Sequence, residues 1–216
     1  MDRRVALKNM GLVLGYSVAT PTILGIIQSC KDEKNVSWTP DFFTQEEGDV
    51  LRHLVDIILP KTDTPSATDV NVHMFLDKFA NEVMEKEQQD FIKMSMGKFI
   101  DKALSDSGKE NAEELTPDDL EPVLAGSLKI TKEEQEAHFE LIEAYNKSIG
   151  EGGTATLDGS SARFAFAYNL RENAIYAYKT SEYVGEEVLA YLPVPGPEFI
   201  SCGDLQELTG GRDWSI

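Results

Sequence analysis

The sequence predicts a mostly α-helical protein, with a single helical domain followed by an extended, proline-rich C-terminal segment. Apolar residues recur at helical spacing in several segments, and capping motifs precede many of these segments. There is no series of alternating strands and no internal repeat. A chain of 216 residues buries roughly 70% of its unfolded surface, which is enough for one stable domain.

The first two helices are predicted from an N-terminal cap and an apolar stripe. Thr44 followed by Glu47 forms a capping box, and the helix after it ends at Pro60. Residues 60–69 form a turn-rich loop. Asp69 is then predicted to cap a second helix, whose apolar face holds Val72, Phe75, Leu76, Phe79 and Val83.

Three further helices follow in the middle of the chain. The third carries Phe91, Phe99 and Leu104 and is expected to end near Gly108. Thr116 and Pro117 place an N-cap before a proline at the first helical position, which opens a short fourth helix. A capping box at residues 131–134 begins a fifth helix, which stops near Gly150.

The C-terminal third is predicted to contain one long helix and then an extended tail. Residues 150–160 are rich in glycine and are predicted to form a flexible hinge or a hairpin loop, and a helix is expected from about 161 to 178. From Thr180 onward the chain carries "YLPVPG". Pro193 and Pro195 fix φ and remove backbone donors, so no regular helix is expected there.

The N-terminus is predicted to be an export signal. Arg3 and Arg4 precede an apolar stretch over residues 11–27 that contains three glycines and a proline. A membrane-spanning helix needs ~20 strongly apolar residues, so this stretch is more typical of a cleavable leader. The paired arginines resemble a twin-arginine signal. The alternative is an ordinary secretory signal in which two arginines occur by chance.

The sequence at residues 27–30 resembles a lipobox, with Cys30 as the residue that receives the lipid. This predicts a signal peptide over residues 1–29, a lipid-anchored tether over 30–40 and the helical domain over 41–216. The protein is then expected in the cell envelope, in the periplasm and anchored to a membrane by lipid. Residues 31–33 resemble a surface-export signal, so exposure at the cell surface is a further possibility.

The charge of the chain excludes nucleic acid as a partner. The formal net charge is −18. Without residues 1–29, the chain has 17 basic and 37 acidic residues, a net charge of −20. Such a surface repels both nucleic acid and anionic lipid headgroups. The two cysteines, Cys30 and Cys202, do not form a disulfide framework.

The sequence contains no recognisable catalytic, cofactor-binding or metal-binding motif. The dinucleotide-binding, haem-attachment, zinc and hydrolase motifs are all missing. A di-iron helical bundle needs Glu three residues before His, and none of His53, His73 and His138 has it. His53 with Asp56 and His73 with Asp77 are interpreted as local, surface hydrogen-bonding pairs.

The C-terminal third carries the only motif specific enough to indicate a family. The relevant positions are Leu170, Arg171, Tyr178, Thr180, Ser181, Glu182, Tyr191, the Pro-Val-Pro-Gly stretch at 193–196, Phe199 and Cys202. In this pattern the chain resembles the gluconate 2-dehydrogenase subunit 3 family. Residues 56–67 and the last three residues also fit. Glu198, Phe199 and Ser201 depart from the residues usual in the family.

The resemblance implies a small, non-catalytic subunit of a membrane-associated oxidoreductase. FAD is expected in a partner, a GMC-type flavoprotein large subunit, and a cytochrome c subunit is a further candidate partner. The small subunit would act in assembly, export or membrane tethering of the flavoprotein. An alternative from another class is an independent envelope lipoprotein that binds a small ligand or a protein.

The predicted partner interface is the aromatic and proline-rich segment near the C-terminus. Proline-stiffened segments lose little entropy on docking, and aromatic residues are enriched at interface centres. The alternative is that this segment packs on its own domain as a terminal strap. The residues assigned to the interface are Tyr178, Thr180, Tyr191, Pro193, Pro195, Gly196, Phe199 and Cys202.

Overall fold

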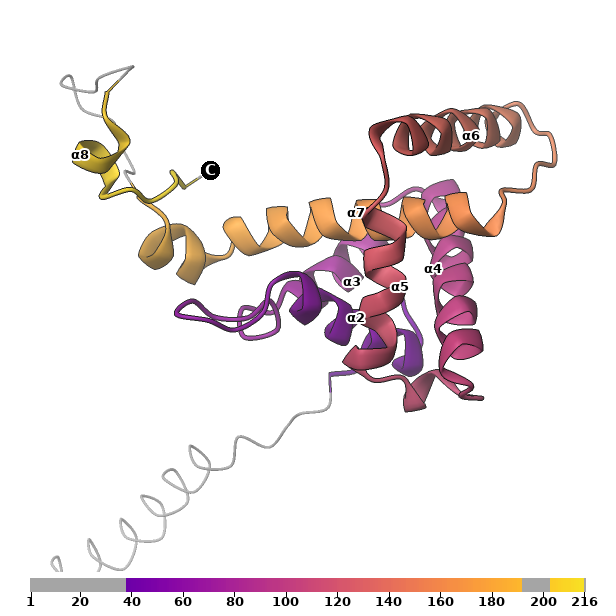
Figure 1. Ribbon diagram of the computed structural model, residues 1–216, viewed down its shortest axis with the longest axis horizontal. Coiled ribbons are helices and arrows are strands. Elements are labelled where there is room, and N and C mark those ends of the chain that lie inside the picture. The colour runs from indigo at the N-terminus through magenta and orange to yellow at the C-terminus, as the bar shows by residue number, and fades with distance from the viewer. Residues whose placement is uncertain (1–37, 192–202, 216) are drawn as a thin grey trace, which may run out of the picture. The chain divides into compact units, whose positions relative to one another are not determined.

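The computed structural model describes residues 38–191 and 203–215 (Figure 1). From Thr39 onward the chain forms one compact unit. The predicted export and lipidation residues Arg3, Arg4 and Cys30 lie outside the described residues, as does the segment that holds Pro193 and Pro195.

The described chain is mostly helical, which confirms the predicted fold class. Its only β pairing is a single parallel bridge between Ala190 and Trp214. The long helices are α2 (Gln45–Ile58), α3 (Val72–Glu82), α4 (Lys86–Ser107), α5 (Pro117–Leu128), α6 (Lys132–Gly150) and α7 (Gly159–Lys179). The short helical segments are η1 (Ala112–Glu114), η2 (Val184–Val188) and α8 (Leu205–Thr209).

The predicted capping boxes form as expected. The Thr44 hydroxyl accepts a hydrogen bond from the Glu47 N–H at 3.2 Å, and the Glu47 carboxylate accepts one from the Thr44 N–H at 2.9 Å. The same reciprocal pair joins Thr131 and Glu134 at the start of α6. These motifs satisfy backbone donors that would otherwise have no partner in the first turn of a helix.

The predicted cap of the second helix is wrong. Helix α3 begins after Asn71, whose backbone is left-handed with φ of 60°. Asp69 instead accepts a hydrogen bond from the Ser66 N–H at 3.1 Å and pairs with Lys61 at 2.9 Å. Asparagine tolerates the left-handed region better than most residues, so the chain turns at Asn71 and Asp69 stabilises the preceding loop.

Helix α7 is the centre of the domain. It contacts α2, α3, α4, α5 and α6, and Figure 1 shows it crossing α4 and α5. Its buried residues include several alanines, which let neighbouring helices approach closely, and two phenylalanines. Phe166 packs against Phe99 of α4 with ring centroids 5.3 Å apart. Helix α7 begins at Gly159, two residues before the predicted start, and its N-cap is Asp158, whose carboxylate accepts hydrogen bonds from the Ser160 and Ser161 N–H groups.

A buried carboxylate fixes the point at which the chain enters the domain. Asp77 of α3 accepts hydrogen bonds from the backbone N–H groups of Asp41, Phe42 and Phe43 at 2.7, 3.1 and 3.0 Å. A buried carboxylate is stable only when it is well bonded in this way. The bonds hold the segment before α2 against α3.

The tail beyond α7 is partly helical, where an extended chain was expected. Residues Val184–Val188 form a π-helical turn, and Leu205–Thr209 form a short α-helix. The last residues return to the end of α7. The Ala190 N–H donates to the Asp213 carbonyl at 2.8 Å, and Ser215 N–H donates to the Ala190 carbonyl at 3.0 Å.

Candidate functional site

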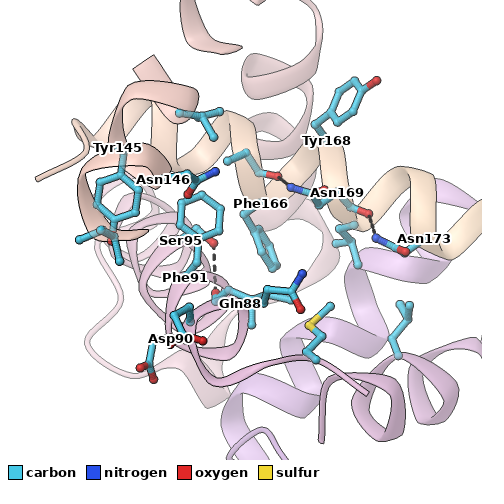
Figure 2. Close-up of a pocket in the computed structure, with 18 of the residues that line it drawn as sticks. Gln88, Asp90, Phe91, Ser95, Tyr145, Asn146, Phe166, Tyr168, Asn169 and Asn173 are labelled. Atoms are coloured by element: carbon cyan, nitrogen blue, oxygen red, sulfur yellow. Dashed lines mark hydrogen bonds between the residues drawn. The ribbon is translucent and has the colours of Figure 1, made fainter. Parts of the chain in front are cut away.

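An apolar groove lies among helices α3, α4, α6 and α7. Its volume is about 650 Å³, within the ~300–1,000 Å³ typical of ligand pockets. Figure 2 shows Phe91 and Phe166 in its interior, with Tyr145 and Asn146 entering from α6. Most of its wall is aromatic or aliphatic. The aromatic lining residues are Phe43, Phe79, Phe91, Phe139, Tyr145, Phe166 and Tyr168.

Helix α6 forms one wall of the groove and is held there by a few side-chain contacts. The imidazole Nδ1 of His138 lies 2.9 Å from the Ser161 hydroxyl of α7, and its ring stacks on Phe164. At the other end, Tyr145 packs on Phe91 of α4 with centroids 5.6 Å apart. No residue of α6 is fully buried, so the groove remains open along this helix.

A row of amides gives the groove its polar character. The side-chain amide of Asn169 donates to the Ala165 carbonyl at 2.9 Å, and that of Asn173 donates to the Asn169 carbonyl at 2.8 Å. Figure 2 shows both bonds along α7. Each amide donates one of its two N–H groups within the helix, and no hydrogen bond to either side-chain carbonyl oxygen is formed by the described residues, so these oxygens remain as acceptors. We call Asn169 and Asn173 the asparagine row.

The groove is acidic at its edge. Glu87 and Asp90 of α4 line it, and its lining residues, all of them described, include no lysine, arginine or histidine. Asp90 pairs with Lys86 at 2.5 Å on an exposed part of α4. Exposed pairs of this kind contribute only about 0.3–0.5 kcal/mol. The groove therefore favours a ligand with an apolar body and hydrogen-bond donors or a positive charge.

The predicted interface residues Tyr178 and Thr180 bond within their own chain. The Tyr178 hydroxyl donates to the Pro65 carbonyl at 2.8 Å, which joins the end of α7 to the loop after α2. The Thr180 hydroxyl donates to the Tyr176 carbonyl at 2.8 Å and closes the last turn of α7. Part of the predicted interface thus has a structural role.

Tyr191 belongs to the predicted interface and has no hydrogen-bond partner for its side chain among the described residues, so it is available to a partner. Its side chain is 51% exposed, and Tyr176 and Tyr183 are exposed nearby in the sequence. The remaining predicted interface residues, Pro193, Pro195, Gly196, Phe199 and Cys202, lie outside the described residues.

The C-terminal residues hold both ends of the proline-containing segment. Besides the bridge at Ala190, the Lys179 ammonium lies 2.6 Å from the Asp213 carboxylate. Lys179 ends α7, and Asp213 lies close to the C-terminus. The chain that leaves the domain at Tyr191 therefore returns to the same end of α7. We call residues 184–191 and 209–215 the C-terminal clasp.

The interpretation of His73 as a surface residue is wrong. Its side chain is 6% exposed, packed in α3. The pKa of His73 is lowered to about 4, chiefly by burial and also by the nearby positive charge of Arg52, while Asp56 and Asp77 act in the opposite direction. Both carboxylates have backbone partners: Asp56 accepts from Thr68 N–H at 2.9 Å, and Asp77 accepts from residues 41–43. His73 is neutral at physiological pH.

Neither a cluster of metal ligands nor a membrane-spanning helix occurs in the part of the chain that the structure describes. No group of three or more histidine, cysteine or acidic side chains there is placed to hold a metal ion. No helix there combines the length and apolar character that crossing a membrane requires.

The family profile of gluconate 2-dehydrogenase subunit 3 matches residues 45–196, from the start of α2 into the proline-rich segment. The chain belongs to the gluconate 2-dehydrogenase subunit 3 family. No curated protein and no solved structure matches it. The predicted resemblance is therefore confirmed. Phe199 and Cys202, which were also assigned to the family pattern, lie beyond the matched range.

Membership of this family implies partner subunits, because its members are a third subunit of gluconate 2-dehydrogenase. All groove residues except Phe43 lie within the matched range. Sequence reasoning had placed Phe91 on the third predicted helix and had not singled out the asparagine row. The available signal was an asparagine repeated four residues apart, which places both amides on one face of the helix.

Proposed function

We propose that this chain is the non-catalytic small subunit of a gluconate 2-dehydrogenase-type oxidoreductase complex. It acts in assembly, export or membrane tethering of a GMC-type flavoprotein, which carries FAD. A cytochrome c subunit accepts the electrons in such a complex. The family match supports the subunit assignment. The periplasmic location and the lipid anchor at Cys30 belong to the same proposal and rest on the leader sequence.

The C-terminal clasp is the observation that carries the docking part of the proposal. Main-chain bonds join Ala190 to Asp213 and Ser215, and Lys179 at the end of α7 pairs with Asp213, so the chain is held at residue 190 and again at residue 213. A segment with fixed ends and two prolines loses less conformational entropy when it docks. Tyr191 at its start offers an aromatic side chain of a type enriched at interface centres.

Two tyrosine variants separate docking from packing. We expect Tyr191→Ala to weaken binding to the flavoprotein of a neighbouring reading frame about thirtyfold, or ~2 kcal/mol, without changing the melting temperature. Tyr178→Phe removes the bond to Pro65 and should cost about 1 kcal/mol of folding stability while leaving binding intact. Co-purification and melting curves measure both. Unchanged binding with a large loss of stability in Tyr191→Ala contradicts the docking role.

The alternative function, an independent envelope lipoprotein that binds a ligand, is favoured by one observation. The aromatic groove of about 650 Å³ is large enough for a small molecule. A genome with no flavoprotein reading frame beside this gene, together with a small apolar compound bound in the groove, would support this alternative.

A further inference from the structure

We propose that the groove beneath α6 binds a basic, amphipathic α-helical segment of a partner subunit. The proposal rests on the proposed function, because that function supplies the partner. It adds a second docking site, on the α6 side of the domain, that is separate from the C-terminal clasp. Three features of the groove indicate this occupant: its open wall, the apolar surface that extends beyond it and its charge.

The open wall is helix α6 itself. The residues of α6 that face the domain are Gln135, His138, Ile142, Tyr145 and Ile149, and all are only partly buried. They recur every three or four residues, which is the spacing of a helix face that packs against another helix. Phe139, next to this stripe, lines the groove and is 42% exposed. Helix α6 thus has apolar surface that its own domain does not cover.

The apolar surface continues past the groove along α3. Phe79 lines the groove and stacks on Phe75, with ring centroids 6.0 Å apart, and Phe75 is exposed. Val83, which is 60% exposed, directly precedes the lining residue Met84. A small ligand inside the groove leaves these residues uncovered. A helix that lies across the opening covers them and places its apolar anchors inside.

The charge of the site selects a basic helix. Glu87 and Asp90 line the groove without any basic side chain, and the whole chain has a net charge of −18. Lysine or arginine at the end of a docked helix can pair with Glu87 and compete with Lys86 for Asp90. The carbonyl oxygens of Asn169 and Asn173 can accept hydrogen bonds from the same side chains. Complementary charge raises the association rate and excludes acidic partners.

The test uses the full chain and two labelled peptides of about 18 residues, or five helical turns. Both carry leucines at helical spacing, and one has lysine and arginine on its polar face while the other has glutamate. Fluorescence anisotropy should show that the basic peptide binds to the protein and that the acidic peptide does not. Asn146→Arg and Asn169→Arg place a cation at exposed positions of the groove wall and should each weaken binding at least about tenfold.

The matched control is Ala144→Arg, which adds the same charge to an exposed position of α6 outside the groove lining. It should change the affinity by less than about threefold, because Ala144 does not line the groove and a charge away from the docked helix is screened by solvent and salt. Equal weakening by Ala144→Arg and Asn146→Arg shows general attraction to an acidic protein and overturns the proposal. Binding of neither peptide overturns it as well. Self-association of the chain that Asn146→Arg abolishes makes a second copy the occupant and also overturns it.

The outcome is distinguishable from failure of the proposed function. If Asn146→Arg abolishes binding of the basic peptide but the chain never co-purifies with a flavoprotein, the groove proposal is supported and the proposed function fails. If Tyr191→Ala weakens flavoprotein binding while the chain ignores both peptides, the subunit assignment stands and the groove proposal fails.

Discussion

Helices α6 and α7 are neighbours in the chain and of similar length, at 19 and 21 residues, yet they are opposite in burial. Helix α7 buries nine residues and α6 buries none. Helix α7 contacts five other long helices, whereas α6 packs mainly on α7 (Figure 1). The difference indicates that α7 holds the domain together, whereas α6 mainly forms one wall of the groove.

The residue types explain this difference. Five of the nine buried residues of α7 are Ala162, Ala165, Ala167, Ala174 and Ala177, and alanine lets backbones approach closely on several sides. Helix α6 has charged residues around most of its circumference, and Glu133, Glu136 and Glu140 are exposed. The free energy needed to remove such charged side chains from water would exceed the stabilisation gained by packing them. Helix α6 therefore keeps a single partly buried stripe.

The largest expected effect comes from α7. Phe166 is buried and packs on Phe99 of α4. We expect Phe166→Ala to lower the free energy of unfolding by about 3–5 kcal/mol, because it removes a large side chain and leaves a cavity. Urea denaturation measures this. A loss below ~1 kcal/mol would show that α7 is not the centre of the core.

A smaller effect is expected from pH, and it too should act on the helices around α7. His73 lies in α3, which packs on α7. Its pKa is about 4 in the folded protein and about 6.5 in an unfolded chain. Above pH 6.5 neither state is protonated and stability is full. As the pH falls from 6.5 toward 4, the unfolded state gains a proton that the folded state does not, so stability is lost.

The expected loss between pH 7.5 and pH 5 is roughly 1–2 kcal/mol from His73. Denaturation curves at several pH values measure it, and His73→Gln is the control because it cannot titrate. The difference in slope between the two proteins over this range isolates the histidine. If both lose the same stability, the carboxylates account for the pH dependence and His73 does not.

The structural features that could be predicted from the sequence are those that depend only on residues close together in the chain. Thr44 with Glu47 and Thr131 with Glu134 form capping boxes that involve only one turn of chain. The prediction at Asp69 was wrong because two local options competed, and tertiary packing selected the left-handed turn at Asn71. The groove could not be predicted, since Phe79, Phe91, Tyr145 and Asn169 come from four helices and no short-range pattern connects them.

The smallest effect on folding stability is expected from Phe139 of α6. It is 42% exposed and forms edge-to-face contacts with Phe164 and Tyr168, each with centroids 5.2 Å apart. Such contacts contribute about 0.5–1.5 kcal/mol when buried. Because this ring is partly exposed, Phe139→Ala should lower the free energy of global unfolding by less than about 1 kcal/mol.

The contacts of Phe139 hold α6 against α7, so their loss should act locally on α6. Hydrogen exchange should accelerate in the amides of α6 and stay unchanged in those of α7, since a helix with no buried residue opens without unfolding the domain. The same mutation should also weaken binding of the basic peptide, because the Phe139 ring lines the groove. A loss of stability comparable to that of Phe166→Ala would contradict the comparison, because α6 would then unfold together with the core and could not act as a separate wall of a docking groove.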